Sequence, residues 1–325
     1  MGYSFLPKLS VVDSLSKSFK YQLRDSYLEI LRETNEFDSE IFPRKMHDDF
    51  SLIKPDLLNG FHSVVYHHAI ELLNEEKYIE AKDILASIIY GNVDSHTGIV
   101  LNSQIDTTLL NLMLEKSIIG LDSYKIDLEP MEKEADITAK ENLEYGMSIL
   151  KDCESSLYDE TKNLVSSIVF FSSKKGVGNN KLYSLTSNAM QSLIMIEGRH
   201  NNSWIFLLDK YIHEAAHSLL FAINLKEELF YNSEDERYSS PLRKDPRPLS
   251  GIYHATFVIQ RLIYAFKNIL KKAMLNTADK ESIQKILEFY LERVNDGYET
   301  ITKYGKLSPV AKYMIEEGQA TIQSA

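Results

Sequence analysis

The sequence SWIFLLDKYIHEAAHSLLFAIN, at residues 203–224, gives the strongest structural signal in this chain. Apolar residues recur throughout it, with alanines between them, so it predicts a helix that is apolar on most sides. Such a helix is expected to be largely buried. Asn201, Asn202 or Ser203 can cap its start.

The predicted helix carries the motif His-Glu-x-x-His at His213, Glu214 and His217. Residues four apart share one face of a helix, so the two imidazoles can hold one metal ion. Glu214 lies beside them, close enough to act on a ligand of that metal. Burying these polar groups inside a helix costs free energy unless they form hydrogen bonds or bind a metal, and a metal ion would offset this cost. Two core histidines satisfied by hydrogen bonds are the alternative.

The rest of the chain predicts an α+β fold that is mostly α. A helical N-terminal half precedes a small antiparallel sheet next to the His-Glu-x-x-His helix, and further helices follow it. The helices expected in the first half cover residues 11–34, 60–75, 77–89, 105–119 and 137–150. A polar, acid-rich stretch at 122–136 is expected to be a linker or a long loop.

The strands are expected within residues 164–171, 181–186 and 190–196, with a hairpin turn at 172–180. The later helices are expected at 252–275, 280–296 and 307–317, the last with Ser308 as its cap.

The change of character near residue 160 predicts two domains. Residues 1–160 would form a helical domain that is free to bind a peptide leader, and residues 161–325 would form a metal-binding catalytic domain. A chain of 325 residues is long enough for this arrangement.

Composition excludes several classes of protein. The formal net charge of −11 argues against a nucleic-acid partner, which would need a basic surface. Cys153 is the single cysteine, so no internal disulfide can form, and a reducing compartment fits. The N-terminus lacks the pattern of a secretion signal, and no apolar run reaches membrane-spanning length. These features predict a cytoplasmic protein without a membrane partner, and they leave its oligomeric state unknown.

A catalytic metal usually has three protein ligands and an open position, so the two histidines need a third partner. The best candidate is His254, which follows a proline-rich segment and has an apolar flank that favours an inward side chain. For a zinc site, the acids Glu227, Glu228 and Glu234 are alternatives to it.

Arginines near His254 are a second indication of function. Prolines on either side hold the backbone at Arg243 and Arg247, and a guanidinium group binds a carboxylate through two parallel hydrogen bonds. Arg261, seven positions after His254 on the same predicted helix face, is a third candidate. These residues predict a bound carboxylate next to the metal, unless they pair with the acids of residues 227–236 instead.

Three segments together resemble a known family. They are HEAAH at 213–217, PLRKDPRPLSGIYHA at 241–255 and LSPVAKYM at 307–314, and the second is the most discriminating. The combination is similar to the HExxH-type peptide β-hydroxylases, which tailor ribosomally synthesised peptides. The resemblance covers about residues 165–320 and implies Fe(II), 2-oxoglutarate and a precursor peptide substrate.

The resemblance also implies roles for individual residues. His213, His217 and His254 would hold the iron, and Arg247 or Arg243 would bind the distal carboxylate of 2-oxoglutarate. Many such oxygenases use two histidines and a carboxylate, and three neutral imidazoles leave more positive charge on the metal. Glu214 is therefore expected to balance that charge from nearby.

Two enzymatic mechanisms remain open at this stage. The first is the Fe(II)/2-oxoglutarate oxygenase that hydroxylates a side-chain carbon of a peptide. The second is a zinc metallopeptidase in which Glu214 is the general base that deprotonates a metal-bound water. A binding protein with a structural metal would need a fourth ligand, and the sequence offers none that is apparent.

Overall fold

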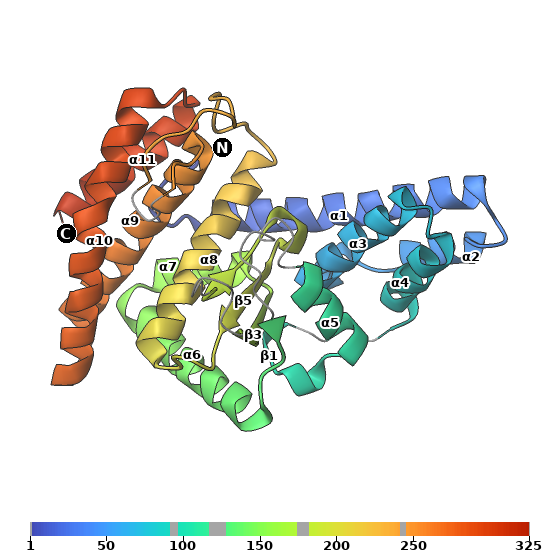
Figure 1. Ribbon diagram of the computed structural model, residues 1–325, viewed down its shortest axis with the longest axis horizontal. Coiled ribbons are helices and arrows are strands. Elements are labelled where there is room, and N and C mark those ends of the chain that lie inside the picture. The colour runs from blue at the N-terminus through green and yellow to red at the C-terminus, as the bar shows by residue number, and fades with distance from the viewer. Residues whose placement is uncertain (1, 92–96, 117–127, 174–181, 241–244, 325) are drawn as a thin grey trace. The chain divides into compact units, whose positions relative to one another are not determined.

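The computed structural model describes residues 2–91, 97–116, 128–173, 182–240 and 245–324 (Figure 1). Over these residues the fold is a mostly-α α+β fold, as the sequence predicts. None of the helices described is both long enough and apolar enough to cross a bilayer.

The chain divides into two compact units, and each is discontinuous in sequence. The histidine unit consists of Met1–Asp13, Thr138–Leu164 and Asn201–Ala325, and the sheet unit consists of Ser14–Ile137 and Val165–His200. This division differs from the single boundary near residue 160 that the sequence predicts. The change of composition marks where strands begin, whereas the units depend on which segments pack together.

The sheet unit contains all the named strands. They are β1 (Gly98–Val100), β2 (Leu128–Glu129), β3 (Ser167–Ser173), β4 (Ser184–Leu185) and β5 (Leu193–Glu197). The strand order is β1-β3-β5-β4, with β2 paired to β3 off this path. The pairs β1–β3 and β3–β5 are parallel, whereas β4–β5 and β2–β3 are antiparallel.

The prediction of an antiparallel sheet is therefore wrong, and the sheet is mixed. Successive strands β3, β4 and β5 do alternate in direction, but β4 lies at the edge beyond β5 rather than between the other two. Every residue of β3 and of β5 is buried. Strands that are buried on both faces read as continuous apolar runs and are typical of parallel pairs. The predicted hairpin turn lies mostly outside the described residues, which stop at residue 173 and resume at 182.

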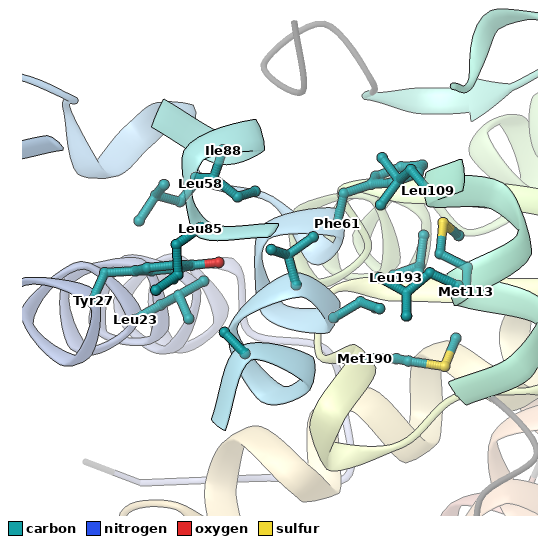
Figure 2. Packing of buried hydrophobic residues seen from close by; sticks show 14 of the residues in the cluster. Leu23, Tyr27, Leu58, Phe61, Leu85, Ile88, Leu109, Met113, Met190 and Leu193 are labelled. Atoms are coloured by element: carbon teal, nitrogen blue, oxygen red, sulfur yellow. The ribbon is translucent and has the colours of Figure 1, made fainter. Parts of the chain in front are cut away.

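Helices of the first half contribute side chains to the core of the sheet unit, together with β3 and β5. The helices are α1 (Leu9–Phe37), α2 (Arg44–Ser51), α3 (Gly60–Asn74), α4 (Tyr78–Tyr90) and α5 (Thr107–Lys116). The start of α1, up to Asp13, belongs to the histidine unit. In Figure 2, Phe61 of α3, Leu109 and Met113 of α5 and Leu193 of β5 lie together in this core. Gly60 allows the close approach of α3 to β5, because a Cβ atom there would lie 2.3 Å from the Cβ of Leu193.

The histidine unit is built from the later helices. They are α6 (Lys133–Cys153), α7 (Ser155–Leu164), α8 (Trp204–Asn224), α9 (Leu249–Lys272), α10 (Thr277–Tyr304) and α11 (Pro309–Ser324). The start of α6, up to Ile137, belongs to the sheet unit. Helix α9 is central, because it packs against α8, α10 and α11 (Figure 1). The predicted caps are confirmed: the amide of Phe206 donates to Ser203 Oγ at 3.4 Å, and that of Ala311 donates to Ser308 Oγ at 3.2 Å.

Helix α6 corrects one expectation and confirms another. Residues 133–136, expected in a linker, form its first turn, whose acidic residues Glu134 and Asp136 suit the positive end of the helix dipole. The rest of α6 includes the helix that the sequence predicts at 137–150. The first part of the expected linker, residues 122–127, lies outside the described residues.

Candidate metal centre

Two helices of the histidine unit bring three histidines together. His213 and His217 lie on α8, one turn apart, and His254 lies in the second turn of α9, which packs against α8. The Nδ1 atoms of His217 and His254 are 3.0 Å apart, and their rings stack at 5.3 Å with an angle of 20° between the planes. The rings of His213 and His217 are 5.0 Å apart. The structure therefore places the third histidine of the sequence analysis beside the second.

Apolar surroundings keep two of these imidazoles neutral. Burial lowers the pKa of His217 to about 4. Burial, reinforced by the nearby His217, lowers the pKa of His254 to about 3. Both rings are therefore unprotonated near neutral pH, and a neutral imidazole is the form that binds metals.

Aromatic side chains form the walls around the histidine pair. Phe221, one turn after His217 on α8, stacks on His217 at 6.1 Å and lies 5.3 Å from His254. Phe230 lies 6.0 Å from His254 and also packs against Tyr253. These rings limit the directions from which water can reach the imidazoles.

The pair fits a metal ion, although a complete set of ligands is not preformed. Two nitrogens bound to one ion at about 2.1 Å, at a tetrahedral or octahedral angle, lie roughly 3.0–3.4 Å apart. The separation of 3.0 Å between the two Nδ1 atoms falls in this range. Among the described residues, however, no group of three or more His, Cys, Asp or Glu side chains is arranged to hold a metal. The chain thus supplies suitable donors, and His213 or another group must approach the pair to complete a site.

Glu214 is almost fully buried beside the first histidine. Its side chain is 5% exposed, and its Oε1 lies 4.0 Å from His213 Nε2. That distance permits electrostatic attraction but is too long for a hydrogen bond. A buried carboxylate in this position suits either a general base or a group that balances the charge of a metal.

No protein-family model and no curated protein matches this chain. The chemistry assigned to the histidines therefore depends on the residues themselves and on the resemblance carried by 241–255.

Arg247 lies in the segment that leads into α9. Its backbone N–H and C=O pair with those of Tyr238, each at 2.9 Å, in an isolated antiparallel bridge. Its side chain is about one third exposed, and its Nη2 lies 2.7 Å from Asp245. Arg243, the other arginine of the same segment, lies outside the described residues. Arg247 is thus partly exposed and pairs with an acidic neighbour.

Arg261 has a different role from the one expected. Its side chain is 1% exposed, and its Nη1 donates a hydrogen bond of 2.6 Å to Glu160 of α7. Its guanidinium also lies 5.0 Å from the ring of Phe5 and 5.2 Å from that of Phe257. Burial raises the pKa of Glu160, and Arg261 opposes this effect. Arg261 is therefore an internal ion-pair partner, and the structure does not support its expected role in binding a co-substrate.

A second polar group on α8 was not recognised from the sequence. Asp209, one turn before His213, is buried and accepts hydrogen bonds from Tyr290 Oη and Lys210 Nζ, both at 2.7 Å. Burial, with Asp209 close by, raises the pKa of Tyr290. An acidic residue inside an apolar run was a signal for this contact, because a buried charge needs a partner. Nothing in the sequence indicated that the partner would be Tyr290.

Proposed function

We propose that this chain is an Fe(II)/2-oxoglutarate-dependent oxygenase that hydroxylates a side-chain β-carbon of a ribosomally synthesised peptide. The observation that carries the proposal is the convergence of His217 and His254, two neutral imidazoles from different helices, with Nδ1 atoms 3.0 Å apart. The resemblance of residues 241–255 to peptide β-hydroxylases supports the choice of reaction.

In this proposal His213, His217 and His254 hold the iron, which together with 2-oxoglutarate and oxygen supplies the oxidising chemistry. Glu214 offsets the positive charge of the metal from its buried position. Arg247 exchanges Asp245 for the distal carboxylate of 2-oxoglutarate. Phe221 and Phe230 exclude water from one side of the pair. The protein thus orients the reactants and protects the reaction from solvent.

A zinc metallopeptidase is the second candidate. The position of Glu214 favours it, because a buried carboxylate 4.0 Å from His213 is placed to act as general base. This alternative assigns no necessary role to the arginines and prolines of residues 241–248, and for that reason it ranks second.

The test uses visible absorption under anaerobic conditions. Wild-type protein given Fe(II) and 2-oxoglutarate should develop a charge-transfer band. His254→Ala should lose the band and bind Fe(II) at least tenfold more weakly, because one ligand is missing. Arg247→Ala should keep Fe(II) affinity near the wild-type value and lose 2-oxoglutarate binding, because the carboxylate loses its bidentate partner.

Two variants in the sheet unit are matched controls. His47→Ala and Arg199→Ala remove side chains of the same types outside the histidine unit, and both should behave like wild type. The metallopeptidase would be the correct assignment if the band is absent, zinc binds tightly and the protein cleaves peptides. Glu214→Gln should then abolish the cleavage. Loss of 2-oxoglutarate binding in Arg243→Ala alone would show that the choice of arginine is wrong.

A further inference from the structure

A polar groove in the histidine unit is not used by the proposed metal centre. It lies between the extended segment 237–239 and the C-terminal turns of α10, and its volume is about 510 Å³. Ligand pockets commonly measure roughly 300–1,000 Å³. We propose that this groove binds the peptide substrate as an added β-strand; this inference rests on the proposed function and gives its substrate a place.

The backbone of segment 237–239 offers a free strand edge. Tyr238 exchanges both of its backbone hydrogen bonds with Arg247. In an antiparallel pair of this kind, the N–H and C=O groups of the neighbouring residues point away from the partner strand. Within the described part of the chain, the backbone groups of Arg237 and Ser239 form no hydrogen bond along the strand edge. An extended peptide can satisfy these groups by pairing with them.

Two carboxylates of the groove are available to a basic peptide. Asp296 and Glu299 lie about one turn apart on α10 and line the groove, and neither forms an ion pair with any described residue. Two basic residues line the groove as well, Arg237 and Lys303. Arg237 Nη1 donates hydrogen bonds to the carbonyls of Glu234 and Glu236, and Lys303 Nζ lies over the ring of Tyr304 at 5.0 Å. Tyr304 also packs against Tyr238, with ring centroids 5.0 Å apart, so the groove has an aromatic wall as well. The net charge of −11 on the whole chain attracts the same class of peptide.

The bridge between Tyr238 and Arg247 connects this groove with the segment that precedes His254. A peptide paired with 237–239 would lie two strand spacings, roughly 10 Å, from the backbone of Arg247. Arg247 directly precedes Pro248, the residue at the start of α9, and His254 lies in the second turn of that helix. Strand addition therefore places the peptide backbone along the same segment that carries the proposed carboxylate-binding arginine.

The test selects peptides and then removes one backbone donor. Random 12-residue peptides are selected by display on the metal-free full chain, and enriched peptides are labelled with fluorescein for anisotropy titrations. Ser239→Pro removes the N–H at the strand edge and should weaken binding about tenfold, the effect of one lost hydrogen bond. Ser239→Ala keeps that N–H and should bind like wild type. The enriched peptides should contain lysine or arginine.

A charge-reversal pair tests the α10 wall. Asp296→Lys combined with Glu299→Lys should weaken the same peptides at least tenfold. Glu281→Lys combined with Glu288→Lys makes an equal charge change at exposed positions of α10 outside the groove, and it should have little effect. Circular dichroism verifies that every variant is folded.

Equal affinity of Ser239→Pro and Ser239→Ala, or no effect of the reversal in the groove, overturns the proposal. The two proposals fail separately, because these titrations use metal-free protein. If the Fe(II)/2-oxoglutarate band is absent, the proposed function fails but the peptide titrations remain valid. If the band is present but peptides bind without selectivity, only the proposed peptide groove is wrong.

Discussion

At the scale of single residues, the contact between His217 and His254 determines how the centre responds to pH. Their Nδ1 atoms are 3.0 Å apart, so one nitrogen donates a hydrogen bond and the other accepts it. Protonating both rings would place two cations side by side in an apolar environment. Ordinary histidines titrate near pH 6.5. The contribution of the pair to stability is therefore complete above that pH and is lost as the pH falls toward 4 for His217 and 3 for His254.

This argument predicts that neither imidazole titrates in the physiological range. In metal-free protein, the ring ¹⁵N signals of His217 and His254 should stay unchanged from pH 8 to pH 5.5, since their pKa values are about 4 and about 3. Nuclear magnetic resonance measures this directly, with signals assigned from His217→Gln and His254→Gln. The same protein unfolded in urea is the control, where both should titrate near 6.5. A midpoint between pH 6 and 7 in the folded protein would contradict the buried pair.

The sequence indicated which histidines face the interior, but it did not indicate the ion-pair partners of the charged residues around them. The spacing of His213 and His217 and the apolar flank of His254 indicated side chains that face the interior. Spacing also placed Arg261 on the face of His254, yet Glu160, more than a hundred positions earlier, forms its ion pair. Which acid meets which arginine depends on how helices cross, and periodicity along one helix does not contain that information.

At the scale of elements, helix periodicity was a better guide than strand patterning. The helices α1, α3 and α4 begin and end within a few residues of the predicted limits. The three expected strands correspond to β3, β4 and β5, but β1 and β2 were not expected, and β3 pairs with β5 in parallel rather than antiparallel. Local sequence specifies that a segment is extended and buried, whereas its neighbour in a sheet is chosen by the rest of the core.

Helix α11 depends on a glycine at its contact with α9. A Cβ atom at Gly318 would lie 2.3 Å from Gln260 Oε1 and 2.8 Å from a ring carbon of Phe5. Gln260 is fully buried and donates hydrogen bonds to Ile315 O and Gln319 Oε1, so it cannot move without losing them. Gly318→Ala should therefore destabilise the protein by about 1–3 kcal/mol despite the better helix propensity of alanine.

Thermal and urea unfolding measure this effect, with Gly251→Ala as the matched substitution. Gly251 lies in α9, and the nearest atoms to a new Cβ there are 3.8 Å away or farther. That variant should be as stable as wild type or gain up to about 1 kcal/mol. If the two variants changed stability equally, the close contact between α11 and α9 would not be the cause.

At the scale of the whole molecule, the proposed metal concerns only one of the two units. His213, His217 and His254 all belong to the histidine unit, and the sheet unit has its own hydrophobic core. A ligand present at about 100 times its Kd stabilises the form that binds it by about 2.7 kcal/mol. A bound metal is thus expected to stabilise the histidine unit, which contains its ligands.

Hydrogen exchange followed by mass spectrometry measures this difference. Adding Fe(II) without oxygen should slow exchange in α8 and α9 and leave α3 and α4 unchanged, since those two helices lie in the sheet unit. His254→Ala provides the control, in which Fe(II) at the same concentration should protect α8 and α9 less than in wild type, because the variant binds the ion more weakly. Protection that spreads equally over both units would contradict the placement of the metal site in the histidine unit alone.

The first residues of the histidine unit are held by its last helix. Glu317 of α11 accepts hydrogen bonds of 2.6 Å from Ser4 Oγ and from the amide of Phe5, and Phe5 packs against the buried Arg261. During synthesis on the ribosome, Phe5 emerges more than 300 residues before its partner Glu317. Nearly the whole chain must therefore be translated before this unit can close, and a premature stop just before α11 would leave Phe5 and the apolar face of α9 exposed to chaperones and proteases.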